Sequence, residues 1–93
     1  MARTVELNRE KPMSPSSVTA LRADALFVSA LQRSDEPSPG QIQQAVAFAL
    51  GVHGRAGCAG RVAQEFGEHP EAAVARMCWA RAAVAAIDPR RMS

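Results

Sequence analysis

The sequence contains no tyrosine and has only four aromatic side chains in 93 residues, which are Phe27, Phe48, Phe66 and Trp79. Apolar residues make up 47% of the chain, but alanine dominates them, so the core that they build is thin. No apolar run approaches the length of a membrane-spanning helix, and the polar start of the chain carries no signal-peptide core. We therefore expect one small cytoplasmic domain of marginal stability that gains from a partner.

The sequence also lacks a strong charge of either sign. Its formal net charge of +2 is too small to mark a nucleic-acid-binding protein, and the basic excess lies in the second half. Nearly all of the basic residues are arginine, and alanine is abundant throughout. Both features are typical of a GC-rich coding sequence, which favours a bacterial origin.

Cysteine is scarce, and the two cysteines, Cys58 and Cys78, are expected to be free thiols in a reducing compartment. Together with His53 and His69 they are the residue types that bind zinc. Structural zinc sites pair their ligands two to five residues apart, and only His53 and Cys58 come near that spacing. No serine or cysteine stands at a recognisable spacing from a histidine to serve as a nucleophile. The sequence therefore predicts no metal, no cofactor and no catalytic residue.

Helical spacing of apolar residues predicts an all-α fold, a compact four-helix bundle with a short third helix. Residues 1–15 are expected to form a flexible arm, with a short edge strand around residues 5–7 left open as an alternative. Residues 16–88 form the single helical domain, and residues 89–93 a flexible tail. The four predicted helices cover residues 18–33, 39–52, 58 or 59 to 66, and 70–87.

Local signals fix several helix ends. Ser38, Pro39 and Gln41 form a capping box with proline at the first helical position, which is the clearest helix start in the chain. Ser16 or Ser17 is expected to cap the first helix, and Gly54 to end the second. Glycine recurs at every third residue from 51 to 60, but a helix precedes these glycines and no lysine follows. This context favours a turn between helices over a phosphate-binding loop.

The corner at residues 67–70, between the third and fourth helices, invites comparison with a helix-turn-helix. Recognition helices reach base edges with polar side chains in their first turns, whereas the fourth helix begins with Glu71 and alanines. The sequence therefore favours two bundle helices that meet at an angle. DNA binding through Arg61 and Arg76 is kept as the alternative.

Three segments, LRADALFVSALQRSDEPS, QQAV and GRVAQEFGEHPEAAVARMCWARAAV, resemble a group of small all-helical proteins of high-GC bacteria. The resemblance covers residues 21–84. It implies a self-contained bacterial domain and transfers no functional residue.

Two charges interrupt the apolar stripes of the predicted helices. Asp24 falls among apolar residues of the first helix, and Arg81 falls between Val74, Met77 and Val84 on the fourth. A buried charge is tolerable when it is paired, so the pattern predicts an Asp24–Arg81 ion pair between helices one and four. The alternative is that either side chain reaches water at the edge of a groove.

The fourth helix is apolar nearly all the way round, because alanines surround Trp79 on the side opposite the stripe of Val74, Met77, Cys78 and Val84. Trp79 is then either the main core side chain or the centre of a docking surface. The predicted partner-binding residues are Trp79, Ala72, Ala75, Ala83 and Ala86. We expect a non-catalytic regulatory or adaptor module that acts by protein–protein contact, with self-association as one form of that contact.

Overall fold

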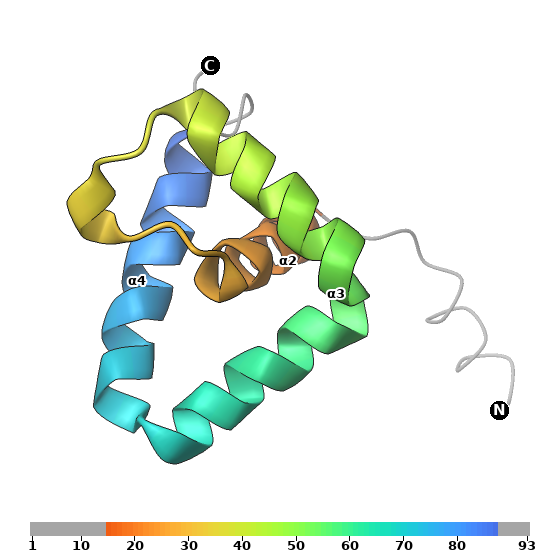
Figure 1. Ribbon diagram of the computed structural model, residues 1–93, viewed down its shortest axis with the longest axis vertical. Coiled ribbons are helices and arrows are strands. Elements are labelled where there is room, and N and C mark those ends of the chain that lie inside the picture. The colour runs from red at the N-terminus through yellow and green to blue at the C-terminus, as the bar shows by residue number, and fades with distance from the viewer. Residues whose placement is uncertain (1–14, 88–93) are drawn as a thin grey trace, which may run out of the picture.

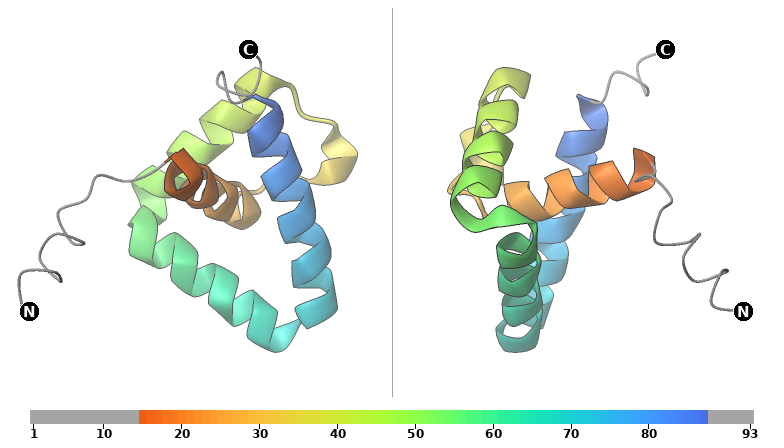
Figure 2. Two further views of the ribbon diagram at one scale, coloured as in Figure 1. Left: turned by 180° about the vertical axis from the view of Figure 1, so that it is seen from behind. Right: turned by 90° about the vertical axis from the view of Figure 1, so that its right-hand side faces the viewer.

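The computed structural model describes residues 15–87, and the predicted arm and tail therefore lie outside the described residues, apart from Pro15. Three α-helices and one short 3-10 turn make up this part of the chain: α2 (Pro15–Val28), η1 (Arg33–Asp35), α3 (Pro39–Glu68) and α4 (Pro70–Ala86). Bent α3 and straight α4 outline a triangle, and α2 runs crosswise to α4 through it (Figures 1 and 2). Helix α2 contacts both of the other helices.

The all-α prediction is confirmed, but the four-helix bundle is wrong, because the predicted second and third helices are the two halves of α3. Gly54 has φ 71° and ψ 174° inside this helix, a combination that is essentially restricted to glycine. The chain bends there and resumes the helix at once. One turn later, a methyl group added to Gly57 would stand 3.1 Å from Cβ of His53, so the inside of the bend is tight.

The predicted start of α3 is confirmed at the level of single hydrogen bonds. The backbone N–H of Gln41 donates to Oγ of Ser38 at 3.2 Å, and the N–H of Ser38 donates to Oε1 of Gln41 at 2.8 Å. Pro39 is the first helical residue. These bonds satisfy two groups that a helix start otherwise leaves unpaired.

Helix α2 is shifted towards the N-terminus relative to the prediction, because it begins at Pro15 and ends at Val28 instead of Arg33. Ser16 and Ser17 consequently lie inside the helix and not at its cap. At the other end, the hydroxyl of Ser29 donates to the carbonyl of Leu26 at 2.6 Å and accepts from the N–H of Leu31 at 3.3 Å. A serine that bonds its own backbone in this way competes with continuation of the helix.

The core lies where α2 crosses the triangle, and twelve apolar side chains are buried there. They are Ala23, Ala25, Leu26, Phe27, Ile42, Val46, Ala49, Cys58, Ala73, Met77, Ala80 and Val84. Five of the twelve are alanines, so the prediction of a thin core is confirmed.

Candidate functional site

Arg76 projects from α4 to the C-terminal end of α2. Its Nε–H donates to the carbonyl of Phe27 at 2.7 Å, while Nη2 donates to Ser29 at 2.9 Å, to Leu31 at 2.8 Å and to Leu26 at 3.4 Å. Helix α2 has no basic residue in its own last turn, so α4 supplies the cation that interacts favourably with this end of the helix dipole. Burial lowers the pKa of Arg76 from its ordinary value.

Trp79 and Phe27 hold the same guanidinium between aromatic rings. The central carbon of the Arg76 guanidinium lies 5.2 Å from the Trp79 ring centre and 5.8 Å from that of Phe27. Trp79 is half-buried and packs against the core from its edge. It is therefore neither a fully buried core side chain nor an open docking residue: it covers the arginine that joins α4 to α2.

The face of α4 that packs inward agrees with the predicted stripe at Met77 and Val84 and differs from it at Val74 and Cys78. The buried residues are Ala73, Met77, Ala80 and Val84, whereas Val74 is 51% exposed and Cys78 is exposed. The helix is rotated relative to the predicted stripe. Among the alanines predicted to surround Trp79 in a partner-binding surface, Ala72, Ala75 and Ala86 are exposed and Ala83 is half-buried.

Burial raises the pKa of Asp24 above its ordinary value. The positive charge of Arg81 is near enough to lower that pKa, but its effect is smaller than that of burial. Over residues 15–87 the structure shows no hydrogen bond or ion pair between the two side chains. Because α4 is rotated, Arg81 lies on the exposed side of the helix. The predicted contact is therefore replaced by a longer-range attraction, and Arg81 reaches water, as in the alternative interpretation.

The two arginines of the DNA-binding alternative line one cavity of about 300 Å³, together with Phe27, Val28, Gln64 and Glu65. Arg61 is exposed on the second half of α3. The guanidinium of Arg76 is bonded to backbone carbonyls, and Glu65 adds a negative charge to the same cavity wall. The cavity brings Arg61 and Arg76 together, as the alternative requires, but the guanidinium of Arg76 is already hydrogen-bonded within the protein.

Both cysteines are free thiols. Cys58 is buried in the bend of α3, where its thiol donates to the carbonyl of Ala49 at 3.8 Å across Gly54. Burial raises the pKa of Cys58, the negative charge of Asp24 raises it further, and Arg61 partly opposes both. Cys58 is thus a buried core residue, whereas Cys78 is exposed on α4.

The histidines lie apart from the thiols. His53 is half-buried beside the bend, and His69 is the exposed residue between α3 and α4. Within residues 15–87, no three histidine, cysteine or acidic side chains come together in a way that could hold a metal ion.

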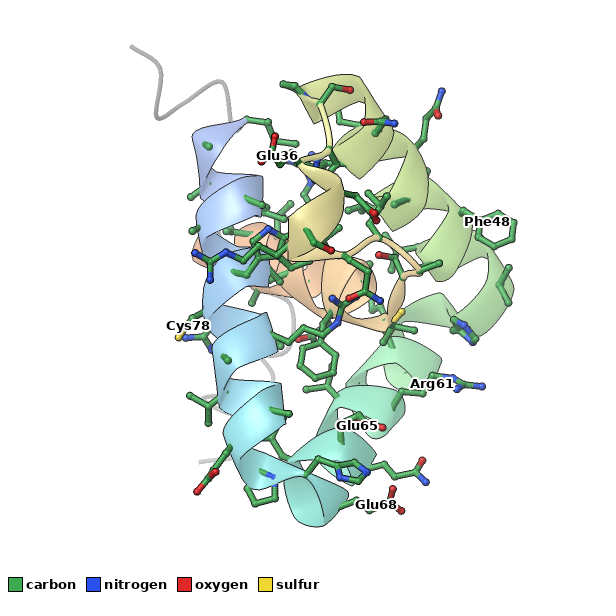
Figure 3. The ribbon with its side chains drawn as sticks, turned by 60° about the vertical axis from the view of Figure 1, so that its left-hand side comes forward. Glu36, Phe48, Arg61, Glu65, Glu68 and Cys78 are labelled. Carbon is green, nitrogen blue, oxygen red and sulfur yellow. The ribbon has the colours of Figure 1, made fainter. Side chains whose placement is uncertain are left out.

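Among the residues whose side chains the structure describes, the most exposed large apolar ones lie on the first half of α3, and the sequence-based prediction did not include them. Phe48 is 73% exposed and Val52 is 58% exposed. In Figure 3 Phe48 points away from the body of the molecule. The signal was present in the sequence, because Phe48 falls opposite the stripe of Ile42, Val46 and Ala49 on a helical wheel, and that stripe packs into the core.

Phe48 forms one wall of a groove of about 540 Å³ between α3 and the segment that follows α2. We call this cavity the Phe48 groove; its lining residues are Ser29, Ala30, Leu31, Gln41, Gln44, Ala45 and Phe48. None of these side chains is charged. The groove can therefore hold an apolar or neutral polar group without leaving a charge unpaired.

No protein-family model matches the chain, and no curated protein or solved structure matches it. Among the helices of residues 15–87, none has the length and apolar character needed to cross a bilayer.

Proposed function

We propose that this protein is a non-catalytic regulatory or adaptor module that acts by protein–protein contact, and that the Phe48 groove receives a segment of its partner. The observation that carries the proposal is the 73% exposure of Phe48 beside an uncharged groove. Phe48 and Val52 are one helical turn apart on α3 and are both more than half exposed, so a partner that covered them would remove this apolar surface from water. A single isolated apolar residue would not support this argument.

The groove suits an apolar side chain presented by a helix or an extended segment. Helix-in-groove recognition uses apolar anchors at helical spacing against a neutral groove, with affinity set by a few well-packed anchors. Two glutamines line the Phe48 groove: Gln44 offers a donor and an acceptor to the partner's backbone, and Gln41, whose Oε1 already accepts from Ser38, offers its amide N–H groups. An adaptor role requires no chemistry beyond such contacts.

One hydroxyl and one thiol of the chain are occupied by hydrogen bonds within the fold, which supports a non-catalytic function. The hydroxyl of Ser29 donates to Leu26, and the thiol of Cys58 donates to Ala49 from a buried position. Binding of DNA has less support than protein binding, because Arg76 is committed to the end of α2 and Glu71 opens α4.

Affinity capture from native cells tests the proposal, with Phe48→Gln as the variant. The matched control is Ala63→Gln, because Ala63 is exposed on the same helix but lies beyond the bend. Because Phe48 is largely exposed, its replacement should change stability by no more than about 0.5 kcal/mol. We expect Phe48→Gln to lose specific captured proteins that Ala63→Gln retains. Equal capture by both variants would remove the Phe48 groove from the function. A mobility shift of DNA that weakens steeply with salt would favour the DNA alternative instead.

A further inference from the structure

Helix α4 exposes a second surface on the side opposite its buried face. Six exposed residues share one side of the helix at spacings of one to three residues. We call this side the outer face of α4; its residues are Glu71, Val74, Ala75, Cys78, Arg81 and Ala82. Val74 is 51% exposed although it is a branched apolar residue. In Figure 3 Cys78 points away from the other helices.

The outer face includes four positions at coiled-coil spacing, of which the two in the middle, Val74 and Cys78, are apolar and the two at the ends, Glu71 and Arg81, are charged. Glu71 and Cys78 are seven residues apart, and so are Val74 and Arg81, with the second pair offset by three residues from the first. Seam positions of two paired helices repeat in this way. Ala82 lies beside the seam and has no bulky side chain to hold a neighbouring helix away. Interhelical distance depends on the size of such side chains.

The charges at the two ends of the outer face select both the occupant and its direction. Glu71 and Arg81 are ten residues apart, a rise of about 15 Å along the helix. A second copy of the chain in parallel orientation would bring like charges together at both ends. In antiparallel orientation, Glu71 faces the partner's Arg81 at one end and Arg81 faces the partner's Glu71 at the other.

We propose that this protein forms a homodimer in which the outer face of α4 pairs antiparallel with the same face of a second copy. In the register that matches the charges, Val74 faces the partner's Cys78 and Cys78 faces the partner's Val74. Two apolar layers in the middle are thus flanked by an ion pair at each end. An interface of one helix pair is at the lower end of the size range, below about 1,200 Å², so the dimer is expected to dissociate at micromolar concentrations.

Charge reversal tests the pairing by sedimentation equilibrium over a concentration series. Glu71→Arg or Arg81→Glu alone converts both ion pairs of the dimer into like-charge pairs, and should weaken dimerisation about 30-fold. The two substitutions together restore opposite charges and should recover the affinity to within about threefold of the original. Glu65→Arg and Arg55→Glu, at exposed positions of α3, make the same changes in net charge away from the seam and should leave the dimer unchanged.

Disulfide formation tests the direction. In the antiparallel register the substituted thiol of Val74→Cys faces the partner's Cys78, so mild oxidation should give a covalent dimer that the unmodified chain does not form. In a parallel pair Cys78 would face the partner's Cys78, and the unmodified chain would form the covalent dimer. Buried Cys58 is not available to confuse the result.

A monomer at every concentration, a charge-reversal pair that does not recover affinity, or a Cys78–Cys78 disulfide in the unmodified chain would each overturn the proposal. Melting curves of the variants, recorded below the dissociation constant, show whether each chain folds. The outer face of α4 does not include the Phe48 groove. Loss of the dimer with intact partner capture, or the reverse, therefore separates this proposal from the proposed function.

Discussion

Replacing Arg76 by methionine removes the guanidinium that joins α4 to the end of α2 and keeps most of the side chain that packs against Phe27 and Trp79. Four hydrogen bonds to backbone carbonyls are lost. Hydrogen bonds that involve a charged group contribute about 1.5–3 kcal/mol each when they are shielded from water. The side chain is only half-buried, so water recovers part of that loss. We expect Arg76→Met to lower the free energy of unfolding by about 2–4 kcal/mol.

This loss is large for a domain of this size, whose total stability is expected to be on the order of 5–10 kcal/mol. Thermal melting followed by circular dichroism should show a midpoint lower by roughly 10–20 °C. Trp79 is the only tryptophan of the chain and lies 5.2 Å from the guanidinium carbon, so its fluorescence reports the same change locally. Arg76→Lys should fall between the original chain and Arg76→Met, since lysine keeps the charge but not the planar set of donors.

Arg55→Met is the matched control, because Arg55 is exposed on α3 and its loss should change the unfolding free energy by no more than about 0.5 kcal/mol. If Arg76→Met is no less stable than Arg55→Met, the carbonyls at the end of α2 do not depend on Arg76. Stabilisation of that helix end by a cation from α4 would then be refuted.

Three further predictions concern Gly54 at the bend of α3, the carboxyl group of Asp24 and the two thiols. Gly54→Ala places a side chain on a backbone with positive φ and should lower the unfolding free energy by about 1–3 kcal/mol. The control is Gly51→Ala, because Gly51 is helical with open space around it, and this variant should be unchanged or more stable by up to about 1 kcal/mol. Equal melting temperatures of the two variants would exclude strain at the bend. Burial raises the pKa of Asp24 above its ordinary value of 3.8, so ionisation of this residue opposes folding. The stabilisation of the protein by Asp24→Asn should therefore grow as pH rises above about 4 and become constant above the folded-state pKa of Asp24. Urea titrations from pH 3 to 8 measure the unfolding free energy, and no gain in that free energy at neutral pH would refute the prediction. A thiol reagent at pH 8 should modify Cys78 rapidly and Cys58 only on unfolding, and two equally fast thiols would contradict the burial of Cys58.

The helix ends that were predicted correctly are those that depend on neighbouring residues. The bonds of Ser38 and Gln41 join groups three residues apart, so the sequence alone determines them. Pro70 begins α4 for the same reason, since its missing N–H costs nothing in the first turn. The end of α2 combines both kinds of contact: Ser29 bonds its own neighbours, but the guanidinium that bonds the last carbonyls comes from Arg76, almost fifty residues further along the chain, and this second contact was not predictable locally.

The number of helices was wrong for a different reason. Gly54 was predicted to end the second helix, which is wrong, because α3 continues beyond its non-helical backbone. A glycine that ends one helix and a glycine that bends it look alike in sequence. What decides between them is the packing across the bend. Cys58 fits against the carbonyl of Ala49, so the second half of α3 resumes at once and leaves no separate connecting segment.

The orientation of α4 shows why its surfaces were assigned incorrectly. Periodicity identifies the buried face of a helix only where apolar and polar residues alternate, and α4 has alanine on every side. Larger side chains such as Val74 and Cys78 were therefore assigned to the core, although the small residues Ala73 and Ala80 are buried where α2 crosses. Small residues allow a close crossing, and Met77 and Val84 are buried on the same face, whereas Val74 and Cys78 are left exposed. The rotation that removes the predicted Asp24–Arg81 bond leaves Arg81 exposed on α4, where its guanidinium is accessible to the partner's Glu71 in the proposed dimer.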